Sequence, residues 1–425
     1  MNTEEKYKEY VNTAFLKAVE PIVIDRAEGA TCFDENGKAY IDCFAGISTT
    51  NAGHANEAIL AAAKAQMEKV VHCCSYVYHV KAVADLAEKM AEITPGRLKK
   101  SFFANSGAEG IEGAVRLAKR YSKKNEAIAL TQSFHGRSYA TLSLTGNAGR
   151  KRGGGPYMPG VAFAPAPYCY RCPFKIGDPE RCDMVCAEHL ADVIRCHTSE
   201  NVAYFVAEPV MGEGGIIPPP PDYFKRVKEI LDHHEILFIA DEVQSGFCRT
   251  GKMFAIEDYG IEPDIMVMAK GIANGFPISC FIAREEIADA FQPGDHLTTF
   301  GGNPVSCAAA LANIEFMIGM NLAEETTRKG EMLRKSLKSL EPKNVVIGEV
   351  RGKGLMVGVE IVKDGKSKEP APEEAGKIRS ALREKGVLIG VGGAFANVIR
   401  IQPPLIISED ELERVTSLLK EVMEG

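Results

Sequence analysis

The segment Asp264-Ile-Met-Val-Met-Ala-Lys-Gly-Ile-Ala-Asn-Gly275 carries the clearest structural signal in this 425-residue chain, because an apolar run ends there and Lys270 follows directly. A second apolar run, in Ile236-Leu-Phe-Ile-Ala-Asp-Glu-Val-Gln-Ser-Gly246, ends at Asp241. Uninterrupted apolar runs of this length are typical of strands in a parallel sheet that helices cover on both faces. If both strands lie in one sheet, Lys270 and Asp241 meet at its carboxyl edge, where open α/β sheets bind ligands.

Lys270 and Asp241 together match one particular chemistry. A lysine can form a Schiff base with an aldehyde, and a carboxylate can keep a pyridinium nitrogen protonated. Pyridoxal phosphate (PLP) requires both groups. We therefore predict that Lys270 and Asp241 are the catalytic residues of a PLP-dependent enzyme.

The rest of the central sequence continues the same pattern. Further apolar runs begin at Ser101, Ala127 and Val202, and helical patterns separate them. In the helix predicted after Gly110, apolar residues recur at the spacing of one helix face. We predict an α/β fold whose large domain has a mostly parallel central sheet with helices on both faces.

The two ends of the chain predict a second, smaller domain. The composition changes near residue 310, and from there helical patterns alternate with short strands. Near the N-terminus, Asn36-Gly37 lies between two strand-like runs and is typical of a hairpin turn. We expect residues 1–60 and 309–425 to form a discontinuous α+β domain, and residues 61–308 to form the large PLP-binding domain.

Composition excludes several classes of function. The formal net charge is −7, 25% of the residues are charged, and no basic block is present. This disfavours binding to nucleic acid or to an anionic membrane surface. The N-terminal ten residues are charged and lack an apolar core, and no apolar run approaches the length of a bilayer span. We predict a cytoplasmic protein without a membrane partner.

Other predicted strand ends also carry polar groups. Asn105-Ser-Gly-Ala-Glu-Gly opens a helix, where backbone N–H groups can bind a phosphate. Ser133-Phe-His-Gly-Arg supplies an aromatic ring and an imidazole that could hydrogen-bond Asp241. Glu208-Pro-Val-Met-Gly-Glu and Thr298-Thr-Phe-Gly-Gly-Asn-Pro follow in later loops. Each motif alone has an ordinary structural explanation, but together they supply partners for a phosphate, a ring, a pyridinium and a Schiff base.

With these motifs the chain resembles the class III (ω-type) aminotransferases, which are fold-type-I PLP-dependent transferases, over essentially its whole length. The motifs that carry the resemblance are Ser106-Gly-Ala-Glu, Phe134-His-Gly-Arg, Glu208-Pro-Val, Asp241-Glu-Val-Gln-Ser-Gly, Ala269-Lys-Gly-Ile and Thr299-Phe-Gly-Gly-Asn-Pro. The Asp-Glu-Val-Gln and lysine motifs at this spacing are highly specific.

The resemblance implies roles for individual residues. Lys270 would hold PLP and move a proton, and Asp241 would pair with the pyridinium nitrogen. The other implied cofactor-binding residues are Ser106, Gly107, Ala108, Phe134, His135, Glu208, Val243, Gln244 and Thr299. Thr299 would come from a neighbouring subunit, which makes a homodimer the smallest active unit and leaves open whether dimers pair into tetramers.

Five residues bear on the substrate. Arg400 resembles the family arginine that binds an α-carboxylate, and Glu213 resembles the gate residue that pairs with this arginine. Arg137 resembles the arginine that binds a distal carboxylate in 4-aminobutyrate, ornithine and acetylornithine enzymes. Ile47 stands where ornithine enzymes carry an aromatic residue, and Tyr76 would narrow the pocket. This set favours transfer of an amino group from an ω-amino acid or related amine to 2-oxoglutarate or pyruvate.

Other functions remain open at this point. Relatives in the superfamily racemise or epimerise amino acids with the same lysine and cofactor, and parts of the chain, such as Lys353-Gly-Leu-Met, resemble alanine–glyoxylate aminotransferases. A catalytically silent protein of the same fold is a further alternative. The intact set of Lys270, Asp241 and Gln244 argues against it.

The chain has 12 cysteines. Seven are scattered among apolar residues and are expected to be buried free thiols. Cys169, Cys172, Cys182 and Cys186 have the CxxC and CxxxC spacing of a zinc site, and a disulfide, an iron–sulfur cluster or reduced thiols are alternatives. We assign them no catalytic role and name no metal ligand from sequence.

Overall fold

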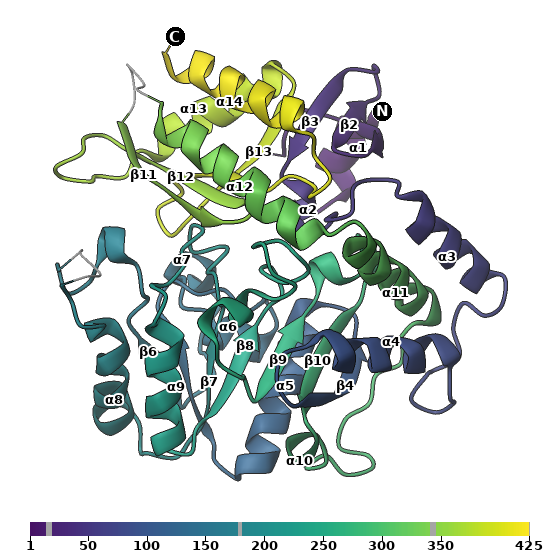
Figure 1. Ribbon diagram of the computed structural model, residues 1–425, viewed down its shortest axis with the longest axis vertical. Coiled ribbons are helices and arrows are strands. Elements are labelled where there is room, and N and C mark those ends of the chain that lie inside the picture. The colour runs from purple at the N-terminus through teal and green to yellow at the C-terminus, as the bar shows by residue number, and fades with distance from the viewer. Residues whose placement is uncertain (14–18, 177–180, 341–345, 425) are drawn as a thin grey trace.

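The computed structural model describes residues 1–13, 19–176, 181–340 and 346–424. These residues form two seven-stranded sheets, one above the other in Figure 1. The larger, lower sheet has the order β4-β10-β9-β8-β7-β5-β6. Its strands are β4 (Leu98–Ala104), β5 (Glu126–Leu130), β6 (Val161–Ala164), β7 (Val202–Ala207), β8 (Leu237–Asp241), β9 (Ile265–Met268) and β10 (Ser279–Arg284).

The larger sheet is mostly parallel and buried on both faces, as predicted. Strands β6, β5, β7, β8 and β9 run parallel, and β10 is antiparallel to both of its neighbours. Alternate residues of β7 belong to separate apolar clusters. Tyr204 packs in the cluster that contains residues of α5 (Gly107–Ser122), whereas Phe205 packs in the cluster that contains residues of α8 (Val185–His197) and α9 (Tyr223–His233). Helices therefore cover both faces.

The smaller sheet joins the two ends of the chain. Its order is β1-β2-β3-β13-β14-β12-β11, and β3 pairs in parallel with β13. The strands are β1 (Ile24–Glu28), β2 (Thr31–Asp34), β3 (Ala39–Cys43), β11 (Val346–Lys353), β12 (Met356–Val362), β13 (Val387–Gly392) and β14 (Val398–Ile401). The predicted hairpin is present between β2 and β3, where Gly37 has a φ of +81° that suits glycine.

The domain boundaries remain a prediction. The expected boundary between residues 308 and 309 falls within α11 (Pro304–Gly319). The terminal ranges also include residues 14–18, 341–345 and 425, which lie outside the described residues.

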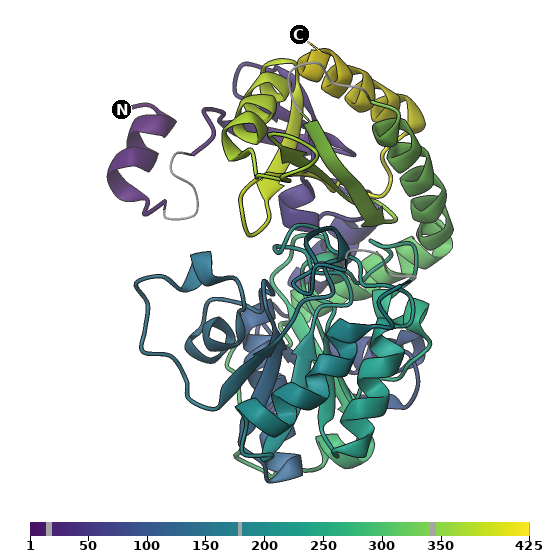
Figure 2. The same cartoon turned by 90° about the vertical axis from the view of Figure 1, so that its left-hand side faces the viewer.

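Helices α12 (Leu322–Lys338) and α13 (Pro372–Glu384) pack against the smaller sheet, and α14 (Glu409–Glu424) packs against both of these helices. The remaining helices are α1 (Thr3–Tyr10), α2 (Ala45–Ser48), α3 (Glu57–Met67), α4 (Lys81–Ile93), α6 (Tyr139–Leu144), α7 (Ala148–Lys151) and α10 (Glu285–Ala288). Helix α1 buries no residue, and Figure 2 shows it apart from both sheets. Among the described residues, no single helix is long and apolar enough to cross a membrane, although the bent pair α11 and α12 passes that test by length and composition.

Four strands were not expected from sequence: β1, β6, β10 and β11. Strand β6 lies within Gly146–Asp183, whose composition suggests an irregular excursion, and residues 177–180 of that stretch lie outside the described residues. Strand β10 follows Lys270 without an intervening long helix and inserts between β4 and β9. Its position depends on long-range pairing, which local periodicity does not record.

Two glycines in helices should respond oppositely to alanine. A Cβ at Gly330 of α12 would lie 2.1 Å from the carbonyl oxygen of Gly354, whereas a Cβ at Gly376 of α13 would meet no atom within 4 Å. We expect Gly330→Ala to destabilise the fold by about 1–3 kcal/mol or more through overpacking against backbone. Gly376→Ala should stabilise it by about 0.5–1 kcal/mol. Thermal unfolding of the two variants measures this difference, and equal shifts of the same sign would contradict it.

Candidate active site

A cavity of about 510 Å³ lies at the carboxyl edge of the lower sheet. Segments that follow β4, β5, β7, β8 and β9 line it. The predicted residues among its lining are Ser106, Gly107, Ala108, Phe134, His135, Arg137, Glu208, Asp241, Val243, Gln244 and Lys270. The motifs at successive strand ends therefore converge on one cavity, as expected for an open α/β sheet.

One end of the cavity is the start of α5. Ser106 is the N-cap residue, and its hydroxyl accepts a hydrogen bond of 3.3 Å from the N–H of Glu109. A Cβ at Gly107 would lie 2.9 Å from Val243, so glycine permits this close approach. The first N–H groups of a sixteen-residue helix carry partial positive charge. This end of the cavity can bind a phosphate dianion.

Asp241 is buried and held from two sides. His135 Nδ1 lies 2.7 Å from Asp241 Oδ2, so the hydrogen bond expected from sequence is present. The N–H of Val243 donates to Asp241 Oδ1 at 3.1 Å. His135 Nε2 is buried and has no hydrogen-bond partner within the described part of the chain. These contacts fix the orientation of the Asp241 carboxyl group.

Glu208 links two loops of the site. Its carboxyl oxygens accept hydrogen bonds from the N–H groups of Phe134, at 3.0 Å, and Gly212, at 2.8 Å. Burial raises the pKa of Glu208 to about 7, and His135 opposes that rise. Through its two hydrogen bonds, Glu208 holds these two loops together, which a glutamate exposed to solvent on a loop would not do.

Lys270 follows β9 directly and has a φ of +46°, which non-glycine residues rarely adopt. Such strain is found where the surrounding structure holds a functional residue in place. Burial lowers the pKa of the Lys270 amine, and the nearby charge of Arg400 lowers it further. In the described ranges its amine has no hydrogen-bond or ion-pair partner. It can therefore act as a nucleophile at lower pH than a surface lysine.

Beside the cavity, Arg400 lies at the centre of a buried polar network. The Arg400 guanidinium is 2% exposed, and it donates to Glu213 Oε2 at 3.0 Å and to Gln244 Oε1 at 2.7 Å. Its third contact is a 3.1 Å hydrogen bond to Gln402 Oε1. The other Glu213 oxygen binds Arg150 of α7, with one contact at 3.1 Å. Glu213 therefore bridges two arginines.

Arg137 differs from Arg400 in its surroundings. It is exposed and lines the cavity, and it forms no ion pair or hydrogen bond with any residue that the structure describes. One arginine at this site is thus neutralised by Glu213, and the other is available to an anion from solvent.

Several of the sequence-predicted residues do not line the cavity themselves. The Tyr76 hydroxyl accepts a hydrogen bond from the N–H of Phe103 at 2.6 Å and donates one to the Phe103 carbonyl at 3.2 Å. Ile47 has a φ of +67° in α2, and Thr299 is exposed. Arg400, with Glu213 bound to it, is linked to the cavity by its hydrogen bond to the lining residue Gln244. The substrate roles of Ile47 and Tyr76, and the contribution of Thr299 to a partner subunit, stay predictions.

Sequence reasoning missed Arg150, Gln402 and Ser48. Gln402 donates to Gln244 Oε1 at 2.9 Å and to Ser48 Oγ at 2.6 Å. Arg150 lies in the glycine-rich segment after β5, where neither periodicity nor a known motif marks it. Residues two apart in a strand point to the same face. Gln402 lies two residues after Arg400, just past the end of β14, so the sequence could have suggested that the two side chains share a face.

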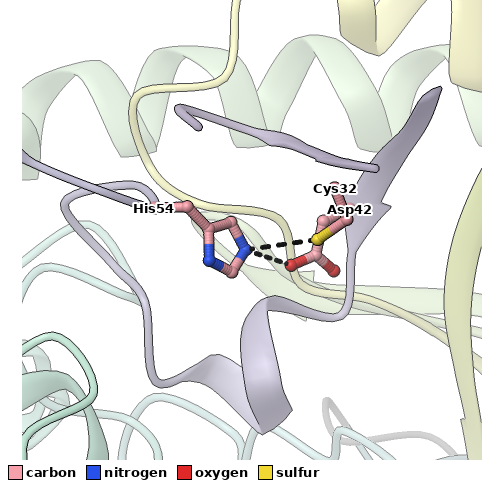
Figure 3. Close-up of side chains that lie close together, drawn as sticks. All are labelled: Cys32, Asp42 and His54. Carbon is pink, nitrogen blue, oxygen red and sulfur yellow. Dashed lines mark hydrogen bonds and ion pairs between the residues drawn. The ribbon is translucent and has the colours of Figure 1, made fainter. Parts of the chain in front are cut away.

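Two groups of side chains with metal-binding atoms lie outside the cavity. All twelve cysteines lie within the described ranges, and none of them forms a disulfide. Of the seven scattered cysteines that were expected to be buried, five are buried, and Cys73 and Cys74 are half-buried. Figure 3 shows Cys32, Asp42 and His54, whose ligand atoms lie within 4.8 Å of one another. His54 Nε2 is 2.7 Å from Asp42 Oδ2.

The second group is the cysteine cluster after β6. Burial raises the pKa of Cys169 to about 11 and that of Cys186 to about 12. Both thiols are therefore weaker nucleophiles at neutral pH than exposed cysteines.

Known proteins share this arrangement. The aminotransferase class-III family matches residues 14–423. A leucine/methionine racemase of Thermococcus litoralis is 39% identical over 412 residues, which cover 96% of this chain and 92% of that protein. An acetylornithine aminotransferase of Caldanaerobacter subterraneus subsp. tengcongensis is 38% identical over 409 residues, 95% of each. An amine transaminase from an uncultivated Pseudomonas species, solved with PLP bound, has a TM-score of 0.91 at 29% identity, covering 97% of this chain and 98% of that one.

The fold is that of a fold-type-I PLP-dependent transferase. The chain belongs to the class III aminotransferase family and is a PLP-dependent aminotransferase by class.

The cavity residues fit this cofactor. The start of α5 offers N–H groups to a phosphate, Asp241 offers an oriented carboxyl group, and Lys270 offers an amine without a protein partner among the described residues. When bound, PLP would supply an aldehyde for amines and a ring that takes up the electrons left on a substrate carbon.

We expect Lys270→Ala to abolish covalent attachment of PLP, because no other lysine lines the cavity in the described chain. Borohydride reduction followed by peptide mass spectrometry should find the cofactor mass on the Lys270 peptide of the wild type. Lys119→Ala is the matched control, since burial also lowers the pKa of Lys119 but this residue lies outside the cavity. Cofactor mass retained on another peptide of the reduced Lys270→Ala variant would exclude Lys270 as the attachment point.

Proposed function

We propose that this protein transfers an amino group from an ω-amino acid or related amine, of the 4-aminobutyrate kind, to 2-oxoglutarate or pyruvate. The observation that carries this proposal is the unequal state of the two arginines. Arg400 is already paired with Glu213, whereas Arg137 at the cavity is exposed and unpaired among the described residues. A donor with one distal carboxylate and no carboxylate beside its amine matches this charge pattern.

Under this proposal the residues of the cavity have separate roles in cofactor binding and proton transfer. The start of α5 would hold the phosphate of PLP, and Asp241, oriented by His135, would pair with the ring nitrogen. Val243 and Phe134 would pack against the ring, and Gln244 would contact its hydroxyl. Lys270, whose pKa is lowered by burial and by Arg400, is neutral often enough to take a proton from the substrate carbon and return it elsewhere.

The acceptor half of the reaction places a different demand on the site. 2-Oxoglutarate carries two carboxylates, so Arg137 binds one and Arg400 must release Glu213 to bind the other. Arg150 already contacts Glu213 and can keep this carboxylate paired after the release. We therefore propose that Arg150 is a positioning residue that makes the exchange on Arg400 inexpensive in free energy.

Subunit assembly and location are further proposals. We propose a homodimer in which Thr299 of one subunit completes the phosphate site of the other, and a cytoplasmic enzyme. The exposure of Thr299 in the isolated chain supports a contribution across an interface.

Racemisation of an α-amino acid is the second candidate, because the Thermococcus litoralis relative is a leucine/methionine racemase at 39% identity. A racemase of neutral amino acids handles a single carboxylate. That carboxylate lies beside the amine, so it would take Arg400 from Glu213 and leave the unpaired Arg137 without a substrate group to bind, which supports the aminotransferase.

The first test is a half-reaction without keto acid. We expect 4-aminobutyrate, β-alanine or acetylornithine to convert the visible band of the PLP enzyme to the band of its aminated form. Arg137→Met should lower kcat/KM for a donor with a distal carboxylate by roughly 10- to 100-fold, the value of a charged hydrogen bond of about 1.5–3 kcal/mol.

Arg137→Lys is the matched control for charge without bidentate geometry, and it should lose less. Alanine as donor and pyruvate as acceptor should be affected little. Equal losses with and without a distal carboxylate would remove Arg137 from substrate binding. If no amine converts the band while the optical rotation of an α-amino acid decays, the enzyme is a racemase.

Glu213 and Arg150 variants should shift specificity in opposite directions. Glu213→Gln frees Arg400, so the KM for glutamate or 2-oxoglutarate should fall while 4-aminobutyrate is used less well. Arg150→Met leaves Glu213 without a partner once a substrate occupies Arg400, so the KM for 2-oxoglutarate should rise by about 10-fold, corresponding to about 1.4 kcal/mol. Steady-state kinetics with both substrates measures these changes. Shifts of the same sign in the two variants would contradict a shared role.

A further inference from the structure

The four clustered cysteines surround one small space. Cys169, Cys172, Cys182 and Cys186 all line a cavity of about 20 Å³ between the segment after β6 and the start of α8. Its other lining residues are mostly apolar: Ala166, Pro167, Tyr168, Pro173, Phe174, Ile176, Val185 and Pro220. Because one water needs about 10–15 Å³ measured in this way, the space suits a single small particle rather than an organic ligand.

The local backbone supports two pairs of thiols. Cys169 opens a 3₁₀ turn, and the N–H of Cys172 donates to the Cys169 carbonyl at 3.3 Å. The N–H of Val185 donates to the Cys182 carbonyl at 3.0 Å, and Cys186 lies in the first turn of α8. Residue Met184, the N-cap of α8, provides no side-chain hydrogen bond there.

We propose that Cys169, Cys172, Cys182 and Cys186 bind one zinc ion as a tetrahedral four-thiolate site. Four soft donors in CxxC and CxxxC spacing select zinc or an iron–sulfur cluster among common metals. The space for one particle favours a single zinc ion over a cluster of several atoms. Four protein ligands leave no open coordination position, so the site is structural and takes no part in amino transfer.

The segment that zinc would hold contacts the smaller sheet. Next to Cys169, the Tyr168 hydroxyl donates to Glu360 of β12, and Arg171 Nε donates to the other Glu360 oxygen at 2.5 Å. Arg351 of β11 binds Glu360 at 2.6 Å and donates to the carbonyl of Gly215 at 2.6 Å. Gly215 lies two residues after Glu213 in the chain. A zinc ion would therefore fix one end of a chain of contacts that reaches the loop of the gate residue. This inference does not depend on which amine is the donor.

Metal content tests the site directly. The purified PLP enzyme is treated with a chelator, reloaded with Zn²⁺, desalted and analysed for zinc and iron. We expect the wild type to retain one more equivalent of zinc per chain than Cys172→Ser or Cys182→Ser. Cys196→Ser, which removes an exposed thiol outside the cavity, is the control and should retain the full amount. Equal zinc in all four proteins, iron in place of zinc, or a disulfide among these cysteines in the untreated protein would overturn the proposal.

X-ray absorption on the zinc-loaded wild type gives a second test that requires no variant. We expect a first shell of four sulfur atoms at about 2.3 Å. Cys32, Asp42 and His54 form a separate group whose ligand atoms lie within 4.8 Å of one another, and zinc there would have one sulfur with nitrogen and oxygen neighbours. A shell of that mixed kind would place zinc there and refute the four-cysteine site, even if the serine variants fail to fold.

Discussion

The burial of Arg400 is the constraint on which the arrangement of this site depends. A guanidinium with 2% exposure must find its hydrogen-bond partners within the protein, because an unpaired buried charge is strongly destabilising. The partners Glu213, Gln244 and Gln402 come from the loops after β7 and β8 and from the segment after β14. The smaller sheet is thereby tied to the carboxyl edge of the larger one. Burial lowers the pKa of the Lys270 amine, and the same positive charge lowers it further, so the pairing of Arg400 also bears on the nucleophile.

Much of the site could be predicted because each motif is local. A strand end, the two or three residues after it and the following helix start are contiguous in sequence, so Ser106, His135, Asp241 and Lys270 could be assigned to one edge of the sheet from sequence alone. The hydrogen bond between His135 and Asp241 was expected on this basis and is present. Assigning PLP also drew on family resemblance, because a single motif of this kind has ordinary structural explanations.

The features that were missed depend on contacts between distant segments. Arg150 lies in a short helix within a segment without periodic pattern, and its partner Glu213 is contributed by another loop. Strand β10 lies antiparallel between β4 and β9 because it pairs with both. Hydrophobic periodicity carries no information about which strands pair. The contact of Tyr76 with the Phe103 backbone is a further case, because the sequence suggests a pocket residue and gives no indication of what its hydroxyl binds.

A transaminase must accept two substrates with different carboxylates at one site, and the bridge from Arg150 through Glu213 to Arg400 offers a physical basis for this. When a substrate carboxylate replaces Glu213 on Arg400, Arg400 stays in an ion pair. The free energy of this exchange therefore depends mainly on the partner that the released Glu213 carboxylate finds. Arg150 is partly exposed, and its pairing with Glu213 is therefore screened and weaker than the buried pairing with Arg400. Under the proposed function, Glu213 would stay paired with Arg400 when the substrate has no α-carboxylate. When a substrate α-carboxylate takes its place on Arg400, Arg150 would still pair with Glu213. Specificity would then reside in the difference between two ion pairs of one glutamate rather than in the shape of the cavity alone.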